Sequence, residues 1–134
     1  MRILYRTLLC LAFAIEIINA DLNSFKASVE HCLKEFPITE GEMRRFIEEK
    51  DVQFGETFKC HMKCVLEKEH IFQNGTLVVD GFIKHSLEMA TLKGREDELQ
   101  KIADECKVEN GVNDCDTAFK LGKCLFAHHT IFVH

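Results

Sequence analysis

The sequence predicts an all-α fold of six helices that are cross-linked by three disulfides. Apolar residues recur every three or four positions through most of the chain, which is the period of a helix with one buried face. No segment alternates apolar and polar residues over a strand's length, and the best candidate, Thr76 to Val79, is too short to need a sheet. An even number of cysteines remains beyond the N-terminal leader, as expected of a small disulfide-bonded secreted domain.

The N-terminal leader has the features of a secretory signal peptide. Arg2 and Arg6 give a basic start, a short apolar run follows from Leu8 to Ile15, and Ala20 is a small residue suited to cleavage before Asp21. The run is too short to span a bilayer. The alternative to a signal peptide is that this segment is a buried N-terminal helix. We therefore expect a signal peptide over residues 1–20, one helical domain over residues 21–134, and a secreted, extracellular product.

Removal of this leader changes the composition of the chain. It takes away Cys10 and Tyr5, so that six cysteines and no tyrosine or tryptophan remain. The net charge changes from −5 to −6, because Arg2, Arg6 and Glu16 leave together. An acidic chain is poorly suited to nucleic acid or anionic membranes as partners. No later apolar run is long enough to cross a membrane, so we expect no membrane insertion.

The first two helices are bounded by recognisable signals. Apolar residues step by three and four from Leu22 to Phe36, and Pro37 ends that segment. Thr39 lies three residues before Glu42, which is the spacing of a capping box at the start of a second helix.

Four further helices follow. The third is expected over Glu56 to Glu69, Asp80 is expected to cap the fourth, and apolar positions mark the fifth over 99–106 and the sixth over 115–126. Between the third and fourth lies Asn74-Gly75-Thr76, a glycosylation sequon in an expected turn. The alternative is a turn that merely contains Asn-Gly; in either case this segment is expected to be exposed.

The cysteines of the third and sixth helices must each bond another element. At 100° per residue, Cys60 and Cys64 lie about 40° apart on one face, with roughly parallel side chains that are poorly placed to bond each other. Cys115 and Cys124 are half a turn out of phase and need different neighbours. One arrangement that meets these constraints joins the third helix to the first and sixth, and the sixth to the fifth. Spacing alone leaves several connectivities open.

Metal binding and redox chemistry are the alternatives for the segment around Cys60. Cys60, His61, Cys64 and His70 include the ligand types of a zinc site. The Cys-x3-Cys spacing on a helix lacks the tight turn of a zinc ribbon, and an oxidising compartment favours disulfides over thiolate ligands. No Cys-x-x-Cys redox pair occurs. Disulfides are therefore the preferred interpretation, and we expect no metal and no cofactor.

The complete cysteine spacing, Cys32-x27-Cys60-x3-Cys64-x41-Cys106-x8-Cys115-x8-Cys124, resembles that of the insect odorant-binding protein family, pheromone-binding proteins included. The resemblance covers the whole chain after the leader. It implies the pairs Cys32–Cys64, Cys60–Cys115 and Cys106–Cys124. It also implies six helices around an internal apolar cavity that carries small hydrophobic ligands, such as odorants or pheromones, through aqueous lymph. The chain departs from the family in lacking Tyr and Trp for a ligand's polar head and in having only ten residues after Cys124.

A pocket of this kind would be lined by inward apolar residues that are not part of a disulfide. Such side chains stabilise a ligand by burying its hydrocarbon surface, and phenylalanine and methionine suit varied ligand shapes. Ordinary core packing is the alternative for each residue. The candidates are Phe58, Met62, Val65, Leu66, Phe72, Phe82, Ile83, Leu87, Met89, Leu99, Phe119, Phe126 and Phe132.

The C-terminal tail carries three apolar residues, Ile131 to Val133, beside histidines. We hypothesise that this segment folds back over the mouth of the cavity as a lid, which charged His128 and His129 would loosen near pH 6. A frayed terminus with incidental histidines is the alternative.

Two other classes of function are alternatives to a carrier. A secreted phospholipase would need a His-Asp pair beside cysteines, and a hydrolase of another class would need a Gly-x-Ser-x-Gly motif. Neither pattern occurs in the sequence. We therefore expect no catalytic residues and no enzyme activity. A secreted protein-interaction or lipid-carrier member of the same fold, acting outside olfaction, is the second alternative. The expected partner is a small hydrophobic ligand, with a membrane receptor as a further candidate and a monomer or weak homodimer as the state of assembly.

Overall fold

The structure is a computed structural model, and it describes residues 25–49 and 53–128. Its elements form six helices with one short hairpin and one turn of 3-10 helix, and the predicted all-α class is confirmed. In chain order they are a helix over residues 25–35, α2 (Glu40–Glu48), α3 (Glu56–Lys68), β1 (Phe72–Gln73), β2 (Thr76–Leu77), α4 (Val79–Leu87), η1 (Ala90–Leu92), α5 (Glu96–Cys106) and α6 (Asp114–Ala127). The predicted signal peptide lies outside the described residues.

The helix starts show one correct prediction and one error. Thr39 and Glu42 form the predicted capping box: Glu42 N–H donates to Thr39 Oγ1 at 3.0 Å, and Thr39 N–H donates to Glu42 Oε1 at 3.1 Å. Asp80 was wrongly expected to cap α4. Val78 occupies the cap position, and its N–H donates to the carbonyl of Ile71 at 2.7 Å. The helix therefore begins where the hairpin ends, and Asp80 lies in its first turn.

The expectation that no strand pairing was needed is also corrected. Phe72 pairs with Leu77 and Gln73 with Thr76 in a two-stranded antiparallel hairpin. Asn74 and Gly75 make the turn at φ values of 54° and 77°, the left-handed conformation that tight hairpins favour at an Asn-Gly sequence. Asn74 is exposed in this turn, and its glycosylation remains a prediction.

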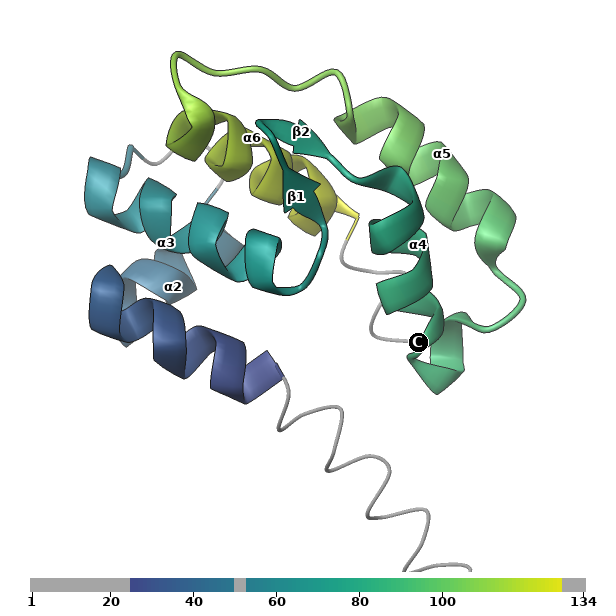
Figure 1. Cartoon of the computed structure of the whole chain (residues 1–134), viewed down its shortest axis with the longest axis horizontal. Coiled ribbons are helices and arrows are strands. Elements are labelled where there is room, and N and C mark those ends of the chain that lie inside the picture. Colours follow the sequence, from purple (N-terminus) through teal and green to yellow (C-terminus); the bar gives the residue numbers. More distant parts are fainter. Residues whose placement is uncertain (1–24, 50–52, 129–134) are drawn as a thin grey trace, which may run out of the picture.

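The helices pack around α3 and α6. Figure 1 shows α3 lying along α6, with α2 and the helix over residues 25–35 on the outer side of α3. The hairpin leads away from the end of α3, and α4 packs on α5 at the other end of the molecule. Gly122 permits a close approach of α6 to α3, because a Cβ there would lie 3.2 Å from Met62 Cε.

The buried side chains form two separate clusters. The larger core joins α4, α5 and α6 with the hairpin and the end of α3; its buried members are Leu66, Ile71, Phe72, Phe82, Leu92, Leu99, Ile102, Ala103, Cys106, Ala118, Leu121 and Leu125. The smaller one is centred on Phe46, Phe58 and Met62, between α2, α3 and α6. Within the described part of the chain, none of the helices combines the length and apolar character that a membrane crossing requires.

Candidate ligand-binding site

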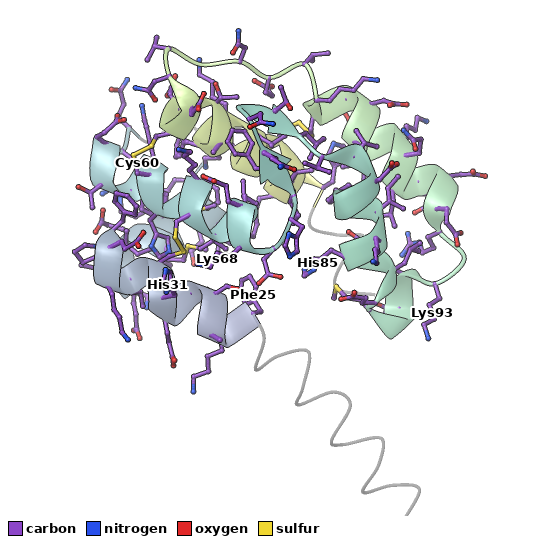
Figure 2. The ribbon with its side chains drawn as sticks, viewed as in Figure 1. Phe25, His31, Cys60, Lys68, His85 and Lys93 are labelled. Carbon is purple, nitrogen blue, oxygen red and sulfur yellow. A yellow bond between two sulfur atoms is a disulfide. The ribbon has the colours of Figure 1, made fainter. Side chains whose placement is uncertain are left out.

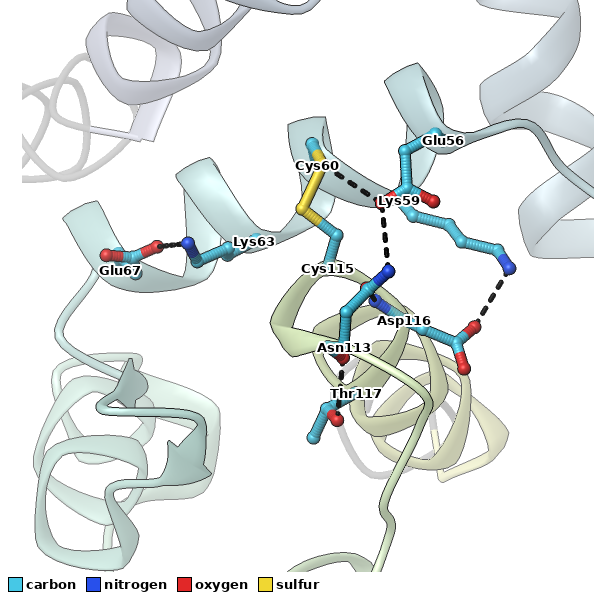
Figure 3. Close-up of a disulfide and its surroundings, with 9 residues drawn as sticks. All are labelled: Glu56, Lys59, Cys60, Lys63, Glu67, Asn113, Cys115, Asp116 and Thr117. Atoms are coloured by element: carbon cyan, nitrogen blue, oxygen red, sulfur yellow. Dashed lines mark hydrogen bonds and ion pairs between the residues drawn. A yellow bond between two sulfur atoms is a disulfide. The ribbon is translucent and has the colours of Figure 1, made fainter.

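Three disulfides hold the helices that surround the candidate site. Cys32–Cys64 joins the helix over residues 25–35 to α3, Cys60–Cys115 joins α3 to α6, and Cys106–Cys124 joins α5 to α6. These are the pairs that the family resemblance implies. Figure 2 shows the side chains in place, and Figure 3 shows the Cys60–Cys115 bond crossing from α3 to the first turn of α6.

The disulfides also bear on the metal alternative. The sulfur atoms of Cys60 and Cys115 lie near the Glu56 carboxylate, but they are bonded to each other and are not thiolates. His61 is buried at 2% exposure, and its Nδ1 lies 3.0 Å from the carbonyl oxygen of Phe36. His70 is exposed. His61 therefore has a structural contact to the segment after the first helix instead of a shared site with the cysteines.

The structure divides the predicted pocket residues between the two clusters. Phe58, Met62 and Phe119 belong to the smaller cluster. Leu66, Phe72, Phe82 and Leu99 are buried in the larger core, with Ile83 and Leu87 half-buried against it. Val65 is buried as well, whereas Met89 and Phe126 are 43% and 37% exposed. The candidates are thus two neighbouring groups, and the enclosed cavity that would unite them remains a prediction.

Five phenylalanine rings contact one another in and beside the smaller cluster, and we call Phe46, Phe54, Phe58, Phe119 and Phe126 the aromatic cluster. Phe46 contacts the other four at centroid distances of 5.2 to 6.2 Å, and Phe54 stacks on Phe58 at 4.2 Å. Sequence reasoning missed two of these residues as site candidates. Phe46 lies on α2, outside the set of predicted pocket residues, and Phe54 precedes α3 and follows no helical period.

Four of the predicted pocket residues keep exposed surface around α4 and at the end of α6. Ile83 and Leu87 project from α4 beside the larger core, Met89 follows that helix, and Phe126 ends the aromatic cluster. Their exposed surface is the apolar area that a bound hydrocarbon could still cover.

A polar pair that sequence reasoning missed lies at the end of α3. Glu69 is buried at 8% exposure, and its Oε2 lies 3.4 Å from Nδ1 of His85 on α4. The other oxygen, Oε1, is buried and has no hydrogen-bond partner among the described residues. The sequence did contain a signal: Glu69 lies four residues after Val65 and seven after Met62, on the apolar face of the helix.

A hollow that no sequence prediction anticipated lies on the outer side of α2 and is open to solvent. It is lined by Glu40, Met43, Arg44, Ile47 and Glu48. Ile47 is 54% exposed there. This hollow lies outside the group of predicted pocket residues.

A charged contact fixes α6 against α3 beside the Cys60–Cys115 disulfide. Lys59 Nζ donates to Asp116 Oδ1 at 2.8 Å (Figure 3). Val112 N–H donates to Oδ2 of the same carboxylate at 3.0 Å. The hydrogen bond from Lys59, followed by the one from the Val112 backbone, lowers the pKa of Asp116 below its ordinary value of 3.8.

Replacing Asp116 by asparagine is expected to lower the free energy of unfolding by about 1–2 kcal/mol at neutral pH. Because the pKa of Asp116 is depressed in the folded state, the carboxylate contributes fully to the free energy of unfolding at pH values above its pKa in the unfolded state. This contribution is lost as the pH falls below 3.8. The difference between wild type and Asp116→Asn should therefore shrink below about pH 4, measured by urea unfolding from pH 7 to 3. Asp114→Asn, two residues earlier and exposed, is the control. A difference that is constant over this range would contradict the assignment.

The hypothesis of a C-terminal lid, with Phe132 and His129, lies outside the described residues. At the edge of the described chain, His128 Nε2 lies 2.8 Å from Oε2 of Glu105 on α5. The end of α6 is thus in contact with α5 at the point where the tail departs.

Comparison with known proteins identifies the family. The sequence model of the PBP/GOBP family matches residues 16–128. The chain belongs to this family, the insect odorant-binding proteins. Odorant-binding proteins are secreted proteins that bind and carry small hydrophobic ligands and are not enzymes. No curated protein matches the chain significantly.

Solved structures show the odorant-binding fold from several insects. Odorant-binding protein 4 of the predator Chrysopa pallens has a TM-score of 0.67 at 20% identity, covering 81% of this chain and 89% of that one. Odorant-binding protein 28a of Drosophila melanogaster has a TM-score of 0.62 at 20% identity, and the match covers 79% of this chain and 89% of that one. The fatty acid binding protein OBP56a from the oral disk of the blowfly Phormia regina has a TM-score of 0.56 at 24% identity, and the match covers 75% of this chain and 84% of that one.

Proposed function

We propose that this chain is a secreted carrier that holds small hydrophobic ligands, such as odorants, pheromones or similar semiochemicals, in an apolar site between its helices and moves them through aqueous lymph. The observation that carries the proposal is the set of apolar side chains around α4 that the core leaves partly exposed: Ile83, Leu87 and Met89. Covering such surface with a hydrocarbon contributes about 25 cal/mol per Å².

The family relationship supports this proposal and suggests the shape of the ligand. The blowfly protein of the same fold is named as a fatty acid binding protein, so an aliphatic chain is a reasonable first class of ligand. We propose Ile83, Leu87 and Met89, together with Phe82 and Val65, as the wall that such a chain contacts. A membrane receptor is proposed as a further partner, and a monomer or weak homodimer as the state of the protein in solution.

The test combines the recovery of a natural ligand with a variant whose new side chain fills the proposed site. Native mass spectrometry of the secreted protein should show a co-purifying small molecule, and displacement of a fluorescent naphthylamine probe should report binding of aliphatic ligands. Ile83→Trp fills the proposed site and is expected to weaken binding by about tenfold or more.

The matched control is Ile47→Trp, which adds the same side chain on the outer surface of α2. It should leave the affinity unchanged. If Ile47→Trp weakens binding and Ile83→Trp does not, the hollow on α2 is the ligand site and the proposed location is wrong. If no aliphatic ligand displaces the probe, the carrier function fails and the protein-interaction alternative gains support.

A further inference from the structure

Glu69 brings a carboxylate into an otherwise apolar face of α3. At 100° per residue it falls between Met62 and Val65, within about 40° of each, and nearly opposite the disulfide-bonded Cys60 and Cys64. Met62 belongs to the smaller cluster and Leu66 to the larger core, so this face is where the two clusters meet.

Only one of the two carboxylate oxygens has a partner in the described part of the chain. Oε2 lies 3.4 Å from His85 Nδ1, and in Figure 2 His85 extends from α4 toward the end of α3. Oε1 is buried without a hydrogen bond. A buried carboxylate oxygen that lacks a donor is energetically costly, and a charged acceptor forms stronger hydrogen bonds than a neutral one.

We propose that Glu69 Oε1, with the carboxylate oriented by His85, accepts a hydrogen bond from the head group of the bound ligand. The ligand class is then a small apolar molecule that ends in an O–H or N–H donor, such as a long-chain alcohol. This inference rests on the proposed carrier function and specifies its ligand. A hydrophobic anion such as a fatty acid carboxylate would meet Glu69 as a like charge and is disfavoured at neutral pH.

The composition of the chain agrees with a carboxylate in this role. No tyrosine or tryptophan occurs after residue 20, so neither a phenol hydroxyl nor an indole N–H is available there to pair with a polar head group. The Glu69 carboxylate can accept hydrogen bonds but has no donor of its own, which predicts selectivity for ligands that donate over ligands that can only accept.

The first experiment needs no variant. Dodecanol and dodecyl methyl ether have nearly the same apolar chain, but only the alcohol can donate a hydrogen bond. The wild-type protein is expected to bind dodecanol about tenfold or more tightly than the ether, measured by displacement of the fluorescent probe at neutral pH. Equal affinities for the two ligands overturn the proposal.

The second experiment assigns the preference to Glu69. Glu69→Leu should reduce the alcohol-to-ether ratio to about one while the ether still binds, and Glu69→Gln should raise the affinity for dodecanoate by removing the like charge. Glu67→Leu and Glu67→Gln are matched controls, because Glu67 is an exposed residue of α3 whose carboxylate lies 3.6 Å from Lys63 Nζ. Both controls should keep the wild-type ratio.

The outcomes separate this inference from the carrier function. If neither ligand binds the wild-type protein, the carrier function fails. If both ligands bind but Glu69→Leu keeps a tenfold preference for the alcohol, another group recognises the head group and the role of Glu69 is overturned. The carrier function is unaffected by that result. The far-UV circular dichroism spectrum shows whether each variant folds. If a Glu69 variant does not fold, the alcohol-to-ether affinity ratio of the wild-type protein still decides the proposal.

Discussion

Replacing Cys60 and Cys115 together by alanine is expected to lower the free energy of unfolding by about 4 kcal/mol, the largest single effect of a cross-link that we predict. The bond joins residues 55 positions apart, and closing so long a loop restricts the unfolded chain strongly. Both cysteines are only half-buried, so little apolar contact is lost with the sulfur atoms. Urea unfolding at neutral pH, without reductant, measures the change.

Glu56→Ala is the control for this disulfide. It removes the carboxylate oxygen that lies 3.7 Å from Cys60 Sγ and leaves the cross-link intact, so it should cost less than about 1 kcal/mol. A loss below about 1 kcal/mol in the double cysteine variant would mean that the contacts between α3 and α6, including the Lys59–Asp116 ion pair, already restrict the chain as strongly as the disulfide does.

Phe46→Ala is expected to cost about 3–5 kcal/mol, because it removes the centre of the aromatic cluster. The ring is 1% exposed, four other phenylalanines surround it, and Lys123 Nζ lies 5.0 Å from its centroid. The neighbouring helices cannot fill the resulting cavity without moving, since α2 is also held at its C-terminal end by hydrogen bonds from Lys123 to the carbonyls of Phe46 and Glu49.

The matched control for Phe46 is the next residue in the helix. Ile47 is 54% exposed, and Ile47→Ala should change the free energy of unfolding by less than about 1 kcal/mol. Similar losses in the two variants would show that the aromatic cluster does not stabilise the contact between α2, α3 and α6. The measurement is again urea unfolding, with the slope compared between variants to check that the unfolded states are alike.

We expect the aromatic cluster and the apolar residues around α4 to have different roles in this odorant-binding protein. The aromatic cluster is dense, with every member in ring contact, and it joins α2 to α3 and α6. Ile83, Leu87 and Met89, which are partly exposed, instead lie on or directly after α4, the helix that also carries His85. We therefore expect Phe46→Ala to act mainly on stability and Ile83→Trp mainly on ligand affinity.

Several elements were predictable because their signals are local. The capping box of Thr39 and Glu42 needs only residues of one turn, and Pro37 ends the first helix through its own ring. The hairpin was missed because its strands have only two residues each, too few for alternation to be visible. Asp80 was misplaced because the backbone bond from Val78 to Ile71 sets the start of α4.

The candidate site was less predictable than the fold. Helical periodicity placed Met62 and Leu66 on one inner face, but it could not show that they belong to different clusters. It also favoured apolar side chains as pocket residues, so that Glu69 was passed over although it lies on the same face.

The sequence by itself determined the helical class, the approximate extent of each helix and, through the spacing of six cysteines, the family. These follow from periodicity and spacing along one chain, which are visible without knowing any partner. Only the tertiary structure decided which apolar faces meet, that α4 begins at Val79, and that Glu69 is buried against His85 with one oxygen free of described partners. The physical reason is that periodicity identifies the buried side of a helix, whereas the neighbour across that side comes from a distant part of the chain and is chosen by packing.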